Sequence, residues 1–79
     1  MSIRLSSHGR RRAKRWKIAA EEIAEALLNR ESERAGEQPG RLVVMGITST
    51  GRRLKIVVPA DDQHFIITCA AQGWRRTEE

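Results

Sequence analysis

The stretch that decides the fold is residues 41–70, RLVVMGITSTGRRLKIVVPADDQHFIITCA. It contains three runs rich in β-branched residues, at 41–49, 52–59 and 64–70, separated by turn residues. Such runs between turn signals predict β-strands. The links between the runs are too short to hold a crossover helix, so we expect the strands to pair as an antiparallel meander.

A helix is predicted shortly before this sheet. Ile18, Ile23 and Leu27 recur at helical spacing, with glutamates early and Arg30 late in the segment. This order of charges suits the helix dipole, and the apolar residues would form one buried stripe. We therefore expect a helix over about 19–30 that covers one face of the sheet.

An earlier helix and a short strand are expected at the N-terminus. Ser6 and Ser7 are good N-cap residues for a helix that begins near His8 or Gly9. Residues 2–6 alternate briefly between polar and apolar, as a short edge strand does. No glycine or proline separates the two predicted helices, so the sequence is compatible with one bent helix or with two.

These elements define the expected fold class. Residues 31–40 are polar, with Gly36, Pro39 and Gly40 marking a loop. We expect an α+β fold in which one or two N-terminal helices pack on an antiparallel β-meander of three to four strands. A chain of 79 residues is short enough that we expect a single domain over 1–79.

Positive charge is concentrated near the N-terminus. The formal net charge is +5, and residues 1–17 contain seven basic side chains and no acidic one. Residues 18–37 are rich in glutamate instead. A local positive field of this kind binds phosphates by releasing their counterions, and RNA is the partner that we expect. The alternative is a solvated basic arm without a partner.

The location of the protein is also predicted from composition. No apolar stretch approaches the roughly 20 residues that span a bilayer, and residues 1–17 lack the apolar centre of a signal peptide. We expect a cytoplasmic protein with no membrane contact. The single Cys69 has no partner for a disulfide or at metal-ligand spacing, so we expect a core residue and no structural zinc.

His8 and Arg12 form the first candidate site. They lie four residues apart, on one face of the predicted helix. Cutting RNA without a metal requires a base, an acid and cations that hold the charge on the phosphate, and an imidazole beside guanidinium groups can supply these. A surface or capping histidine has the same sequence pattern. The neighbouring candidates for RNA binding are Arg10, Arg11 and Arg15.

The strands supply further candidates. Alternation places Arg53, Lys55 and Val57 on one face of the second strand, where the two cations would form a basic floor for RNA. In the third strand it places Thr68 with His64 and Ile66, and leaves Phe65, Ile67 and Cys69 for the core. Ordinary solvated strand residues would look the same.

The aromatic residues argue against a stacking platform. Trp16, Trp74 and Phe65 are the only aromatics, and single-stranded RNA platforms use several. We expect Trp16 to pack between helix and sheet, and Trp74 to contact a partner or extend an edge. The sequence contains no P-loop, GxGxxG, HExxH or serine-centred elbow, so we expect neither a cofactor nor metal-dependent hydrolysis.

Four stretches resemble a family of small toxins of the RelE/BrnT type. They are residues 6–12 (SSHGRRR), 17–23 (KIAAEEI), 46–58 (GITSTGRRLKIVV) and 66–68 (IIT). The chain departs from the family pattern at Trp16, where the family has its second arginine, and at Ala19, where it has a Ser or Thr cap.

The resemblance implies a metal-independent endoribonuclease toxin, neutralised by a cognate antitoxin and in some relatives dependent on the ribosome. It places His8 and Arg12 at the first motif and Thr68 at the closing one. We therefore expect His8 to act as acid or base, Arg12 and Arg53 to bind the phosphate, and Thr68 to orient the RNA. The alternative is a non-catalytic module of the same fold that binds nucleic acid or an acidic partner through the same basic face.

Overall fold

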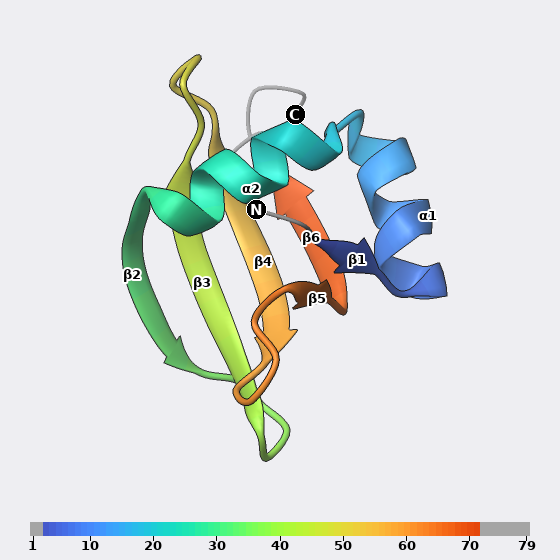
Figure 1. Ribbon diagram of the computed structural model, residues 1–79, viewed down its shortest axis with the longest axis vertical. Helices are drawn as coiled ribbons and strands as arrows, with labels where there is room; N and C mark the ends of the chain where they lie inside the picture. Colours follow the sequence, from blue (N-terminus) through green and yellow to red (C-terminus); the bar gives the residue numbers. More distant parts are fainter. Residues whose placement is uncertain (1–2, 72–79) are drawn as a thin grey trace, which may run out of the picture.

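The computed structural model describes residues 3–71 of the chain (Figure 1). Its elements are, in chain order, β1 (Arg4–Leu5), α1 (Ser7–Trp16), α2 (Ala20–Leu28), β2 (Arg30–Ala35), β3 (Arg41–Ile47), β4 (Arg53–Pro59), β5 (Phe65–Ile66) and β6 (Thr68–Ala71). Four of the strands form an antiparallel sheet in the order β2-β3-β4-β6, and β1 pairs with β5. The α+β class with helices packed on an antiparallel sheet is therefore confirmed.

The helices pack on one side of the sheet. Figure 1 shows α2 crossing the face of β3 and β4, and α1 beside β6. Strand alternation places Leu54, Ile56 and Val58 toward α2, and all three are fully buried. Ile23 and Leu27 of α2 belong to the same core cluster. Cys69 is 2% exposed and Trp16 packs against the same cluster, so both expectations are confirmed.

The prediction of a loop over 31–40 was wrong for its first half. Arg30–Ala35 forms the edge strand β2, which pairs antiparallel with β3 from Arg30↔Gly46 to Ala35↔Leu42. The error has a physical cause, because residues 31–35 are all exposed and carry polar or small side chains. Backbone pairing with the apolar strand β3 holds this segment in place, and backbone pairing leaves no hydrophobic pattern in a sequence.

The predicted third strand, 64–70, is interrupted at Ile67. The Ile67 N–H donates to the carbonyl of Val57 at 2.8 Å, and the chain changes partners there. Ile66 pairs in parallel with Leu5 of β1 and is fully buried, so its expected place away from the core was wrong. The break resets the alternation, which puts Ile66 and Cys69 in one core although they are three residues apart.

Two separate helices are present, and Lys17 ends the first of them. Its backbone is left-handed (φ 55°, ψ 50°). Arg52 fixes the corner: its guanidinium donates to the carbonyls of Trp16 at 2.6 Å and Lys17 at 3.1 Å and pairs with Glu22 at 3.4 Å. Carbonyls at the end of a helix have no hydrogen-bond donor within the helix, and Arg52 supplies one here. Within residues 3–71 no helix is long and apolar enough to cross a membrane.

Substitution of Gly46 tests the contact between α2 and the sheet. A Cβ at Gly46 would overlap the backbone carbonyl of Ala26, because the helix approaches β3 at this point. We expect Gly46→Ala to lower the free energy of unfolding by about 1–3 kcal/mol, measured by urea denaturation. Ser32→Ala on the exposed edge strand serves as the control, with a change within about 0.5 kcal/mol. Equal stability of the two variants would contradict this packing.

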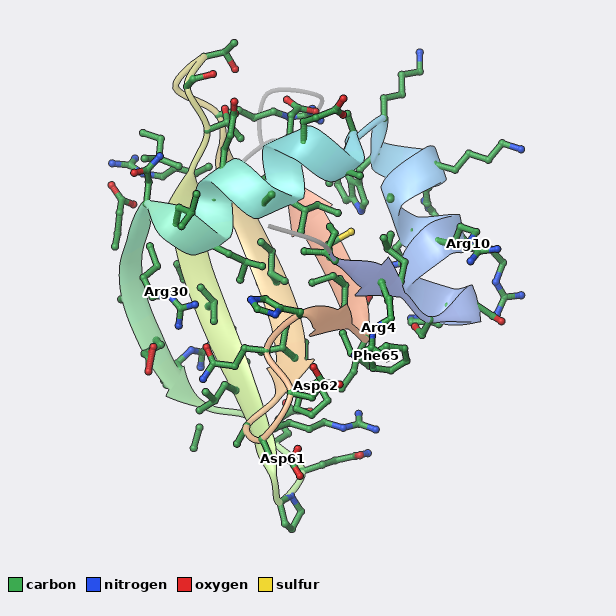
Figure 2. The ribbon with its side chains drawn as sticks, viewed as in Figure 1. Arg4, Arg10, Arg30, Asp61, Asp62 and Phe65 are labelled. Atoms are coloured by element: carbon green, nitrogen blue, oxygen red, sulfur yellow. The ribbon has the colours of Figure 1, made fainter. Side chains whose placement is uncertain are left out.

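Asp62 makes the stability depend on pH. Figure 2 shows Asp62 and Phe65 beside Arg4, and the Arg4 guanidinium donates to the Asp62 carboxylate at 2.5 Å. This hydrogen bond lowers the pKa of Asp62 below its ordinary 3.8. Because the pKa of Asp62 is lower in the folded protein than in the unfolded chain, its carboxylate adds to the free energy of unfolding above the pKa of the unfolded chain. This contribution is lost as the pH falls through the pKa of the folded protein.

We therefore expect wild type to be slightly more stable than Asp62→Asn at pH 6, with the difference vanishing toward pH 2. Thermal unfolding of both proteins at several pH values between 6 and 2 measures this difference in stability. A difference that stays constant across the range would show that the carboxylate does not titrate with this contact.

Candidate nucleic-acid interface

The sheet face opposite α2 has no described helix over it. Across this face the paired residues Arg34, Val43, Val57 and Thr68 form one row through all four strands. The next row contains Met45, Lys55 and Ala70. Cationic, apolar and hydroxyl side chains therefore share one surface, which we call the open face.

Two adjoining hollows mark this face. The larger, of about 390 Å³, is lined by Arg34, Ala35, Gly36, Glu37, Gln38, Arg41, Val43, Lys55, Val57 and Thr68. The smaller, of about 80 Å³, is lined by Arg12, Lys55, Val57, Thr68, Cys69 and Ala70. Because Lys55, Val57 and Thr68 line both, the two hollows form one trough across the sheet.

Ser6 places Arg12 at one end of this trough. As the N-cap of α1, its hydroxyl accepts from the Gly9 N–H at 2.9 Å and donates to the Ile67 carbonyl at 2.8 Å. The same oxygen thus caps the helix and attaches it to the break between β5 and β6. Gly9 lies so close to the sheet that a Cβ would be 2.6 Å from the Ile66 carbonyl oxygen.

The orientation of α1 follows from this contact. Gly9 and Ala13 are its buried residues and face the sheet. Arg12 is partly buried at the margin of that stripe, and its Nε is buried with no hydrogen-bond partner among the described residues. Arg12 also lines the smaller hollow, together with Lys55 and Thr68. Three candidates from α1, β4 and β6 therefore meet at one place.

The cations of the sheet and its loops differ in whether a carboxylate of the fold pairs with them. Arg4, Arg30, Arg52 and Arg53 each form an ion pair within the fold, with Asp62, Glu33, Glu22 and Glu31 respectively. No ion pair within residues 3–71 involves the cations of the trough, which are Arg12, Arg34, Arg41 and Lys55. Carboxylates of the fold thus neutralise arginines elsewhere, and the trough keeps its positive charge.

His8 lies outside the trough. It is exposed on α1, one helical turn before Arg12, and is not among the residues that line either hollow. Its spacing keeps it on the flank of α1 that carries Arg12. Reaching a phosphate held by Arg12 would require the substrate to extend over the N-terminal turn of α1.

The remaining predicted RNA contacts are dispersed. Arg10, Arg11 and Arg15 are exposed on α1. Figure 2 shows Arg10 on the outer side of this helix, away from the sheet. Arg53 shares the strand face of Lys55, as predicted, but its Nε donates to Glu31 at 3.1 Å, and it lines neither hollow. Trp74 lies outside the described residues.

Sequence reasoning missed Arg34 and Arg41. Arg34 lay within the segment predicted as a loop, so no strand face was assigned to it. A signal existed for Arg41, since alternation along 41–47 places it on the face of Val43 and Met45. Locating the basic end of the trough required knowing that β2 pairs with β3.

The chemical groups of the trough suit an anion. Lys55 and three arginines supply hydrogen-bond donors that are charged, and Thr68 adds a hydroxyl. Among residues 3–71, no three His, Cys, Asp or Glu side chains gather closely enough to hold a metal ion. Comparison of this chain with protein-family models, with curated proteins and with solved structures found no match.

Cys69 reports on the attachment of α1. Burial raises the pKa of its thiol above the ordinary 9.0, with Arg12 opposing that effect, and its Sγ lies 3.9 Å from the Gly9 carbonyl oxygen. A thiol that is buried and protonated reacts slowly.

We expect Ser6→Ala to lower stability by about 1–2 kcal/mol, because it removes both the cap and the bond to Ile67. It should also accelerate labelling of Cys69 by a thiol reagent, since α1 covers this side chain. Ser7→Ala is the control, because the Ser7 hydroxyl makes no hydrogen bond within the described part of the chain. Equal labelling rates in both variants would refute the role of Ser6.

Proposed function

We propose that this protein is a metal-independent endoribonuclease that binds RNA along the open face. The observation that carries the proposal is the meeting of Arg12, Lys55 and Thr68 at one end of a trough whose cations have no ion-pair partner in residues 3–71. Phosphate oxygens accept hydrogen bonds from such donors, and a charged trough releases counterions from RNA when it binds.

The proposed roles follow from position. Arg12 and Lys55 hold a phosphate, and Thr68 orients it through its hydroxyl. His8 transfers a proton to or from an RNA segment that extends over α1, one turn before Arg12. Arg53 is left out of this arrangement because it lines neither hollow and its Nε donates to Glu31.

The partners proposed beside RNA rest on the resemblance to the RelE/BrnT type. They are a cognate antitoxin that neutralises the enzyme and, for some substrates, the ribosome. An acidic antitoxin would have the charge that complements the exposed cations of α1 and the trough.

A second candidate function is a non-catalytic RNA-binding module. It is favoured by the position of His8, which is exposed and does not line the hollow that contains Arg12. The two candidates differ in one measurable respect, since only the enzyme cuts the RNA that it binds.

Incubation of labelled RNA with purified protein in the presence of a chelator separates them. For the enzyme, we expect His8→Ala to reduce cleavage by about 10²–10⁴-fold with unchanged affinity. Arg12→Gln should weaken binding about tenfold. Lys14→Gln removes an exposed cation of α1 that lines neither hollow and is the control for loss of charge.

The outcomes are distinct. If wild type does not cleave RNA with or without ribosomes, yet binds it in an Arg12-dependent manner, the protein is the binding module. If cleavage persists in His8→Ala, another group transfers the proton. If Arg12→Gln and Lys14→Gln bind RNA equally well, the trough is not the binding surface.

A further inference from the structure

The far end of the trough carries a second set of cations. Arg34 on β2 and Arg41 on β3 line the larger hollow beside the loop that joins these strands. Arg12 and Thr68 lie at the opposite end, on α1 and β6. The row from β2 to β6 crosses three strand spacings, or about 14 Å. The backbones of Arg34 and Thr68 are thus about 14 Å apart, and α1, which carries Arg12, packs beside β6.

The loop between β2 and β3 positions this second end. The Gly36 N–H donates to the Arg41 carbonyl at 2.8 Å, and the Ala60 N–H donates to the Gly40 carbonyl at 2.8 Å. The first bond closes the loop over Arg41, and the second ties it to the end of β4. Arg41 is partly buried there, and these backbone hydrogen bonds hold its main chain at the margin of the hollow.

The floor between the two ends is apolar. Val43 and Val57 are direct partners across β3 and β4 and lie between Arg34 and Thr68 in the row. Val43 is 7% exposed, whereas Val57 is partly exposed to the hollow. A nucleobase can lie on such an apolar floor while phosphates on either side of it meet cations.

The charge at this end is predominantly positive. Arg34 and Arg41 form no ion pair among residues 3–71. Glu37 is the single acid among the described residues that line the larger hollow, against Arg34, Arg41 and Lys55. The hollow therefore favours an anion, although its loop margin carries one carboxylate.

We infer that Arg34 and Arg41 form a second phosphate subsite, so that one RNA strand occupies both ends of the trough with a nucleotide over Val43 and Val57. This inference rests on the proposed RNA binding at Arg12, Lys55 and Thr68 and extends it to a longer footprint. Each subsite alone holds a phosphate weakly, and a strand that spans both binds more tightly because the second contact becomes intramolecular.

The test compares two lengths of RNA. The probes are 2′-O-methyl uridine oligonucleotides, which lack the 2′-hydroxyl needed for cleavage: a dimer with one phosphodiester and a hexamer that can span the trough. Affinities of wild type, Arg34→Gln/Arg41→Gln and Lys14→Gln/Lys17→Asn are measured by NMR titration at several salt concentrations. The last variant also loses two positive charges, one on α1 and one at its C-cap, and asparagine tolerates the left-handed backbone of residue 17.

We expect Arg34→Gln/Arg41→Gln to weaken hexamer binding at least about tenfold and to reduce the salt slope by about 1.4. Dimer binding should change by no more than about twofold, because the Arg12 subsite remains. The Lys14/Lys17 control should retain hexamer affinity more fully than the Arg34/Arg41 variant.

Other results overturn the inference in distinguishable ways. If the hexamer binds wild type and Arg34→Gln/Arg41→Gln equally, while Arg12→Gln weakens binding, the second subsite is refuted and the proposed function stands. If wild type binds neither oligonucleotide, the proposed function and the subsite both fail. If a hexaglutamate peptide binds as tightly as the RNA and loses affinity in the Arg34/Arg41 variant, the site takes acidic protein chains instead.

Discussion

The hydroxyl of Ser6 is the contact on which the arrangement of this molecule depends. It accepts from the first turn of α1 and donates to the carbonyl of Ile67, where the chain passes from β5 to β6. A helix of ten residues with few apolar side chains would not hold a fixed position by burial alone. The hydroxyl joins this basic helix to the sheet at one defined point, and Gly9 allows the backbones to meet there.

Arg52 supports the same helix from its other end. It occupies the carbonyls that the left-handed Lys17 leaves at the end of α1 and pairs with Glu22 at the start of α2. One side chain from the β3–β4 turn thereby fixes the angle between the helices. The core of Ile23, Leu54 and Ile56 supplies the bulk of the burial, but these polar contacts decide where Arg12 lies.

The protein has a net charge of +5, and the ion pairs decide where its positive electrostatic potential is concentrated. The acids of α2, β2 and the β4–β5 loop pair with arginines that have structural tasks, such as Arg4 and Arg30. Unpaired cations are left on α1 and along the trough. Lys55 and Arg12, which come from separate elements, then reinforce each other because nothing between them neutralises either.

The sequence by itself determined the α+β class, the alternation of side chains along β4, a serine cap at position 6 or 7 and the burial of Cys69, because period, turn residues and caps are local properties of the chain. It also identified Arg12, Lys55 and Thr68 as candidates, but not that they meet. Only the tertiary structure decided that Arg30–Ala35 is a strand, that Ile66 turns into the core, that Glu31 occupies Arg53, and that Arg34 and Arg41 extend the trough. These features arise from backbone pairing and ion pairs between distant segments, which leave no periodic pattern in the sequence.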